Sequence, residues 1–246
     1  DVEVNIKIAL ASAMRKGSLT RPARNKLLAE MTDEVAHLVL ANNYEQTLAL
    51  SLARKRGLAD IAHQGRFMEA LEARGLLNRA VETLPSPAAL AEREARGEAL
   101  TRAELGVLLA YAKIVLFSDI VASDVPDEPH FDRDLMGYFP ERMAKKYTGE
   151  IHGHRLRREI IARVVANDLV NRGGPSFVNR LMESTGRSAA DVVRTFTAVR
   201  DGFALPALYR EIDALDNQID GQIQLDLYQT VSRLIFNTSG WYLKND

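Results

Sequence analysis

Cysteine is absent from this sequence of 246 residues. Its absence excludes a disulfide framework, a thiol nucleophile and a metal site built from thiolates. Cytosolic proteins rarely depend on disulfides, so the composition fits a cytoplasmic protein and we expect that location.

The sequence also lacks an excess of charge of either sign and any long apolar run. Lys and Arg number 32 and Asp and Glu 33, which gives a net charge of −1 at pH 7. A dedicated nucleic-acid-binding domain usually carries a clear basic excess, so we expect no nucleic-acid partner. No apolar run approaches the ~20 residues that span a bilayer, so we expect no membrane partner. The chain starts at Asp1 in what reads as the inside of a helix, so we expect it to be cut from something longer.

Signals for β-structure are missing as well. No segment alternates apolar and polar residues over a strand's length, and no Asn-Gly or Asp-Gly pair joins two β-branched runs. Apolar residues instead recur at three- and four-residue spacing along most of the chain. This pattern predicts an all-α fold, a multi-helix bundle of about ten or more helices without significant sheet.

Local signals predict several helix ends. Thr20 before Pro22 begins one helix, and Thr101 with Glu104 forms a capping box at the start of the most clearly apolar one. Thr32 is expected to cap a helical region that Asn42-Asn43 divides. The last helix is expected near 218–238, so that Trp241-Tyr242-Leu243 follows it as a hydrophobic staple or an interface anchor.

The domain organisation allows two interpretations. Residues 82–100 are poor in large apolar side chains and contain two of the prolines. The chain is therefore either one helical domain over residues 1–246 or a domain with parts at 1–82 and 100–246.

The stretch HGHRLRREIIARVVANDLVNRGG, residues 152–174, looks most like a site. Metal ligands on one helix face stand three or four residues apart, whereas His152 and His154 are two apart, so a polar helix start is favoured over a metal site. The arginines of this stretch alternate with acidic residues, which favours a solvated face with pairs such as Arg155–Glu159 over a phosphate or nucleic-acid site.

Asn167 and Asn171 are more informative, because both fall on the aliphatic stripe of the same helix. A buried amide must find hydrogen-bond partners, so the pair predicts polar packing that fixes the helix, or alternatively the lining of an interface or pocket. We take Asn167, Asn171, Arg158 and His154 as structural or interface polar residues.

No dinucleotide-binding, Walker A, nucleophile-elbow or zinc-protease motif occurs in the chain. Carboxylate pairs such as Asp132/Asp134 and Asp213/Asp216 fall on polar faces without distinguishing context. The residues alone therefore predict no catalytic, cofactor-binding or metal-binding residue.

Five segments together resemble the C-terminal part of the large bacterial NAD-specific glutamate dehydrogenases. They are DVEVNIKIAL, LLAEMTDEVAHLVLANNYEQTLALSLA, LTRAELGVLLAYAKIVL, HRLRREIIARVVANDLVNRGGPSFVNRL and the closing WYL. The resemblance covers nearly the whole chain and implies a non-catalytic helical domain. In that family the whole enzyme oxidises L-glutamate to 2-oxoglutarate and ammonium with NAD, and its catalytic lysine and glycine-rich turn lie upstream of the segment that this chain resembles.

The resemblance also implies partners. The upstream catalytic domains of the same polypeptide would contact this segment, the full enzyme would be a homo-oligomer, and NAD would bind outside this segment. Asp1 and Glu3 would lie nearest the active site of the intact enzyme.

Two other functions stay open at this level. One is a regulatory module in which His154 and Arg155, Arg157 or Arg158 bind an acidic effector, because arginine forks suit carboxylates and phosphates. The other, weaker one is independent binding of nucleic acid, which salt-dependent affinity would reveal.

Overall fold

The computed structural model describes residues 2–245, and these contain helices but no strand. The α-helices are α1 (Val2–Arg15), α2 (Arg21–Glu30), α3 (Thr32–Arg56), α4 (Ile61–Ala73), α5 (Pro87–Ala95), α6 (Arg102–Val121), α7 (Asp132–Gly137), α8 (Glu141–Lys146), α9 (Thr148–His152), α10 (Arg157–Gly173), α11 (Phe177–Thr185), α12 (Ala189–Gly202), α13 (Leu205–Asp213) and α14 (Gly221–Asn245). Three short 3₁₀ turns, η1 (Gly57–Asp60), η2 (Val125–Asp127) and η3 (Pro129–Phe131), join some of them. The predicted all-α fold is confirmed. None of the helices described is long and apolar enough to cross a membrane.

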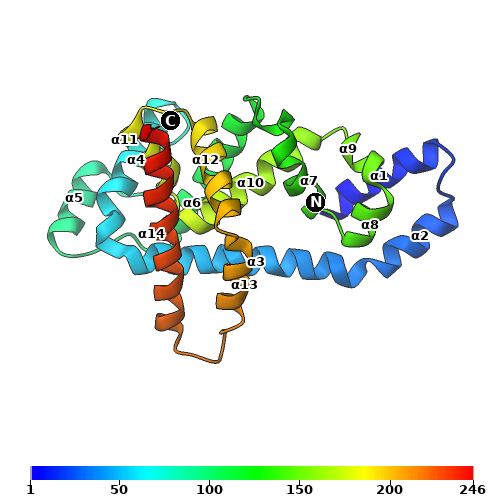
Figure 1. The fold of residues 1–246 in the computed structure, drawn as a ribbon. Coiled ribbons are helices and arrows are strands. Elements are labelled where there is room, and N and C mark those ends of the chain that lie inside the picture. The colour runs from blue at the N-terminus through cyan, green and yellow to red at the C-terminus, as the bar shows by residue number, and fades with distance from the viewer. Residues whose placement is uncertain (1, 246) are drawn as a thin grey trace.

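Helix α3 runs along one edge of the molecule, from α2 at one end to α4 at the other (Figure 1). The helices α13 and α14 form a hairpin that crosses α3 and projects beyond it. Helix α10 lies in the middle and packs against α3, α6, α7, α12 and α14. The fold is therefore arranged around α10.

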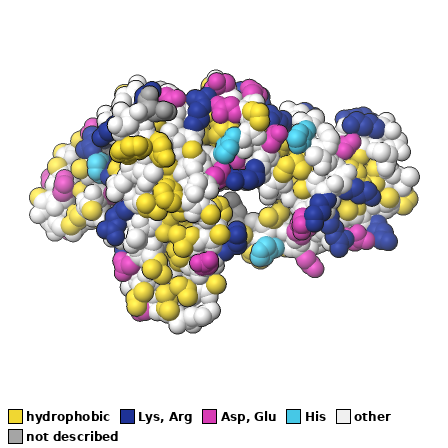
Figure 2. Space-filling view, viewed as in Figure 1, with side chains coloured by type: hydrophobic (Ala, Val, Ile, Leu, Met, Phe, Trp, Pro, Cys, Tyr) yellow, Lys and Arg dark blue, Asp and Glu magenta, His cyan; other side chains and the backbone are white. Residues whose placement is uncertain are grey.

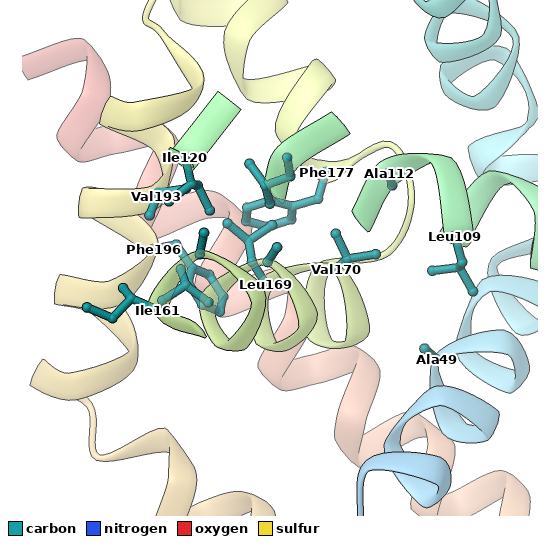
Figure 3. Close-up of a cluster of buried hydrophobic side chains, with 14 of the residues drawn as sticks. Ala49, Leu109, Ala112, Ile120, Ile161, Leu169, Val170, Phe177, Val193 and Phe196 are labelled. Atoms are coloured by element: carbon teal, nitrogen blue, oxygen red, sulfur yellow. The ribbon is translucent and has the colours of Figure 1, made fainter. Parts of the chain in front are cut away.

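The sequence of α10 explains its central place, because its apolar residues come in pairs at helical spacing. Ile161, Val165 and Leu169 are fully buried, and Val170 lies beside them. Figure 3 shows Ile161, Leu169 and Val170 of α10 in one cluster with residues of α6 and α12, namely Ile120, Val193 and Phe196. Burying one such side chain contributes about 1.5–3 kcal/mol to stability.

The predicted caps are present where the sequence signals were local. The Thr20 hydroxyl accepts a hydrogen bond from the Ala23 amide. Thr101 and Glu104 form the reciprocal capping box at the start of α6, and Ser188 caps α12. Each cap satisfies backbone amides that the first helical turn leaves unpaired.

Two predictions about α3 are wrong. Asn42-Asn43 does not divide the helix, and the Gln46 amide instead donates to Asn42 Oδ1 at 2.5 Å along the helix surface. Thr32 does not cap it either, because Met31 occupies the N-cap position and the Thr32 hydroxyl donates to the Leu28 carbonyl. The result is one uninterrupted helix of 25 residues.

The end of the chain also differs from the prediction. Helix α14 spans Gly221–Asn245, so the aromatic pair lies within the helix and not after it. Leu243 is buried, as a terminal staple would be, whereas Trp241 and Tyr242 are 60% and 49% exposed. The shorter prediction missed that Ser239 and Gly240 allow the helix to continue against its neighbours, with Gly240 next to Leu181.

Residues 82–100 contain one short helix, α5, which begins at Pro87 after the N-cap Ser86. Leu84, Leu90 and Leu100 are buried in the same core cluster as residues of α1 and of α14. The division of the chain at this segment remains a prediction.

We expect Ile161→Ala to lower the free energy of unfolding by about 2–5 kcal/mol, because it removes a fully buried side chain of α10 and leaves a cavity. The matched control is Ile114→Ala on α6, whose side chain is 60% exposed. Chemical denaturation should show a change within ~0.5 kcal/mol for that control. Equal losses for both variants would contradict the central place of α10.

Candidate functional site

Polar side chains from four helices meet at the C-terminal end of α10, some buried and some half-buried in a largely apolar bundle. We call this group the Arg172 cluster; it consists of Glu45 from α3, Lys113 from α6, Asn171 and Arg172 from α10, and Tyr209 from α13. Arg172, Asn171 and Tyr209 are 7%, 3% and 5% exposed. Burying polar groups of this kind costs free energy unless hydrogen bonds or ion pairs compensate for the lost water.

The Arg172 guanidinium is held on two sides. Its Nη2 lies 3.0 Å from Glu45 Oε1, and its central carbon lies 3.9 Å from the centre of the Tyr209 ring. The Asn171 amide donates to the other Glu45 oxygen at 3.5 Å. One carboxylate therefore links α3 to two consecutive residues of α10, and one arginine links α10 to α13.

The last carbonyls of α10 are satisfied by side chains from elsewhere in the chain. The Ser232 hydroxyl donates to the Arg172 carbonyl at 2.9 Å, and Arg56 Nη1 donates to the Gly173 carbonyl at 2.6 Å. A cation at this end also suits the negative end of the helix dipole. Gly174 has a φ of 92°, a backbone conformation that residues with a Cβ rarely adopt, so this turn favours glycine.

Burial sets the electrostatics of the Arg172 cluster. It raises the pKa of Glu45, although Arg172 opposes the shift by favouring the carboxylate. It lowers the pKa of Lys113 to about 8, with Glu45 acting in the opposite direction. It also raises the pKa of the Tyr209 hydroxyl.

Pairing within the Arg172 cluster is incomplete. Asn171 Oδ1, Arg172 Nε and the Tyr209 hydroxyl have no hydrogen-bond partner among the protein atoms described. A partly satisfied polar network contributes less to stability than a fully paired one. The Arg172 cluster therefore fixes helix positions more than it adds stability.

A second charged centre, which we call the Arg200 centre, lies one helical turn before Arg172 on α10. The sequence did not predict it. The Arg200 guanidinium of α12 lies 2.8 Å from Asp134 of α7 and 2.9 Å from Asp168 of α10, and it also pairs with Asp201. Burial alone would lower the pKa of Arg200, but its hydrogen bonds to Asp134 and Asp201 raise it. Acidic and basic side chains also gather on the surface around α7 and the start of α10 (Figure 2).

Asp134 is thus a buried ion-pair partner, not a polar-face residue as predicted. Asp213 likewise accepts a hydrogen bond from the buried Tyr228 hydroxyl. A signal for the Arg200 centre was present, since Arg200 continues the apolar stripe formed by Val193 and Phe196. A charge on such a stripe needs a buried partner.

His154 lies between α9 and α10 and contacts α1. It is buried, its Nδ1 accepts from the Leu156 amide at 3.0 Å, and its Nε2 lies 3.2 Å from the Asn5 carbonyl. The ring is therefore neutral with the proton on Nε2, and burial lowers its pKa. Among residues 2–245 no group of three or more His, Cys, Asp or Glu side chains is arranged to hold a metal ion.

The arginines next to His154 make contacts between elements. Arg157 donates to the Pro126 carbonyl and pairs with Asp132 at 2.8 Å. Arg158 donates to the Val121 and Ser123 carbonyls and pairs with Asp127. Arg157 and Arg158 thus hold the connection after α6, and they are not a free anion site. The expected Arg155–Glu159 pair does not form in the part of the chain that is described.

The two asparagines differ in their surroundings. The Asn171 side chain is buried and donates to Glu45, whereas the Asn167 side chain is half-buried and makes no hydrogen bond to the described residues. The two asparagines lie on the flank of α10. The fully buried face of the helix is instead formed by Ile161, Val165 and Leu169. The prediction that both amides are buried therefore holds for Asn171 and not for Asn167.

Glu3 is on the exposed side of α1 and pairs with Lys7 one turn later. Its side chain lines a small apolar pocket between α1, α2 and α3. Asp1, the other residue expected near the active site, lies outside the described residues.

The fold and the Arg172 cluster define an all-α domain whose long helices are linked by buried charged centres. Residues 97–246 match the family model described as the C-terminal region of glutamate dehydrogenase, and residues 1–53 match the catalytic domain of bacterial NAD-glutamate dehydrogenase. The first of these matches covers more than half of the chain, so the chain belongs to the glutamate dehydrogenase C-terminal family. The resemblance seen in the sequence is confirmed.

Three proteins named NAD-specific glutamate dehydrogenase are similar along almost the whole chain. The identity is 49% over 245 residues for that of Pseudomonas aeruginosa, 46% over 244 for Halomonas elongata and 35% over 243 for Mycobacterium tuberculosis. The alignments cover 99–100% of this chain but only 15% of each relative. The chain therefore spans about a seventh of the length of these relatives.

Lys113 makes the stability of the domain depend on pH. An unfolded lysine titrates near ~10.4, so between about pH 8 and ~10.4 the unfolded chain binds more protons than the folded one. The contribution of Lys113 to stability therefore rises with pH across this window.

We expect Lys113→Met to raise the free energy of unfolding at neutral pH and to flatten that rise, as measured by denaturation at a series of pH values. Lys26→Met, at a position that is 81% exposed, is the control and should change neither quantity. A Lys113→Met variant with the wild-type pH dependence would contradict the burial of this ammonium group.

Proposed function

We propose that this chain is the C-terminal helical domain of an NAD-specific glutamate dehydrogenase, and that it supports the catalytic core without taking part in the chemical step. The whole enzyme would oxidise L-glutamate to 2-oxoglutarate and ammonium, with NAD bound by its other domains. It would act in the cytoplasm as a homo-oligomer in amino-acid catabolism.

One observation carries the proposal. Glu45 lies within the segment that matches the catalytic domain, and Asn171 and Arg172 lie within the segment that matches the C-terminal region. The contacts of 3.0 Å and 3.5 Å between them therefore join the two matched segments through buried charge. A domain that supports the catalytic core needs such a rigid connection.

The test uses the full-length enzyme that would carry this chain. Arg172→Met leaves the Glu45 carboxylate without its cation and removes the contact with Tyr209. We expect it to lower stability by about 1.5–3 kcal/mol, the scale of a hydrogen bond to a charged group, and to lower glutamate-dependent NAD reduction as the core loosens.

The matched control is Arg210→Met, an exposed position of α13 where we expect wild-type activity. The chain of 246 residues should produce no NADH from glutamate and NAD when assayed without the rest of the enzyme. Turnover by that chain alone would refute its supporting role, and an Arg172→Met enzyme as stable as wild type would refute the proposed connection.

A second candidate function is regulatory binding of an acidic effector, at a groove that includes His154 and Arg155 of the predicted set but not Arg157 or Arg158. Arg157 and Arg158 are occupied, but Arg155 lines a groove of about 410 Å³ together with Lys7 and Arg15 of α1. Arg15 and Arg155 form no ion pair with the residues described, so both can bind a carboxylate.

Succinate is a suitable probe of this groove. If the groove binds it, saturation at about 100 times the dissociation constant should add ~2.7 kcal/mol of stability, seen as a thermal shift. The double variant Arg15→Ala/Arg155→Ala should lose the shift, and Arg210→Ala should keep it. The same shift in all three proteins would place the binding elsewhere and remove this candidate.

A further inference from the structure

Helix α2 and most of α3 have few partners within this chain. No residue of α2 is buried, and the buried residues of α3 begin only at Ala49. Helices of this length owe most of their stability to packing of an apolar face. A long stretch of these two helices therefore lacks the packing that its order requires.

The exposed part of α3 has the composition of an interface. The ten residues between Glu34 and Glu45, VAHLVLANNY, include no Lys, Arg, Asp or Glu. Val39 and Leu40 are nevertheless 45% and 65% exposed. Solvent-facing helix surfaces usually carry charges, whereas the centres of protein interfaces are depleted of them.

A pocket adjoins this surface at the corner of α1, α2 and α3. It has a volume of about 320 Å³ and is lined mainly by Ile6, Leu28, Met31 and Val35. Val35 lies one helical turn before Val39, so the pocket and the exposed apolar side chains are continuous along α3. The pocket is large enough for an apolar side chain from a partner.

We propose that this surface, formed by Val35, Ala36, Val39 and Leu40 of α3 with the adjoining pocket, is the docking face for the rest of the catalytic domain of the same polypeptide. The inference rests on the proposed function. Residues 1–53, which include the whole docking face, match the catalytic domain, and the relatives contain more than six times the length of this chain. The partner is thus the remainder of a domain to which α1, α2 and most of α3 already belong.

The deciding experiment is photo-crosslinking in the full-length enzyme. A benzophenone amino acid replaces Leu40, and in a control protein it replaces Ile114 of α6, which is 60% exposed. We expect crosslinks from position 40 to residues of the same polypeptide that precede residue 1 and match the catalytic domain, and none to them from position 114. Crosslinks from position 40 to a second subunit, to other domains or to nothing would overturn the docking face.

A substitution measures the consequence of docking. Leu40→Asp should lower glutamate-dependent NAD reduction by about tenfold or more by shifting the catalytic domain, and Ile114→Asp should leave it unchanged. Wild-type activity in Leu40→Asp would overturn the docking face. Absence of glutamate-dependent activity in the wild-type full-length protein would instead refute the proposed function, while the crosslinks would still show what covers α3.

Discussion

The position of the Arg172 guanidinium between the Glu45 carboxylate and the Tyr209 ring determines how the long helices of this domain meet. Apolar packing around α10 supplies most of the stability, but it is non-directional and tolerates small shifts. The charged contacts are directional, and breaking one of them leaves a buried group without a partner. They therefore fix α3 and α13 at one end of α10.

The Arg200 centre fixes α7 and α12 against α10 in the same way, one helical turn before Arg172. Burial is the main cause of the raised pKa of Glu45, and the charge of Asp168, which also pairs with Arg200 at 2.9 Å, adds to it. Removing charges from water costs several kcal/mol per ion, which only close geometry and added hydrogen bonds offset. Such centres favour one defined arrangement of helices, because any other arrangement would leave buried charges without partners.

Much of the fold followed from the sequence because helix signals are local. The capping box of Thr101 and Glu104 involves residues three positions apart, and its geometry is fixed as soon as α6 forms. The Asn42-Asn43 break was wrong because the low helix propensity of two residues costs at most ~1–2 kcal/mol, which a helix of 25 residues can absorb. The Arg200 centre was beyond such reasoning, since it joins residues 66 positions apart. The spacing of His152 and His154 argued against a metal site, but it could not indicate that the partner of His154 is Asn5, 149 positions away.

The uninterrupted helix α3 connects the apolar pocket to the Arg172 cluster. A helix of 25 residues is about 37 Å long at ~1.5 Å per residue, and it keeps its two ends in a fixed relation. One end meets α1 and α2 at the apolar pocket, and the other is buried at Ala49, Leu52 and Ala53 against the bundle, with Glu45 of the Arg172 cluster just before it. A break at Asn42-Asn43 would have separated these ends. Because the helix is unbroken, the proposed docking face and Glu45 of the Arg172 cluster belong to one rigid element.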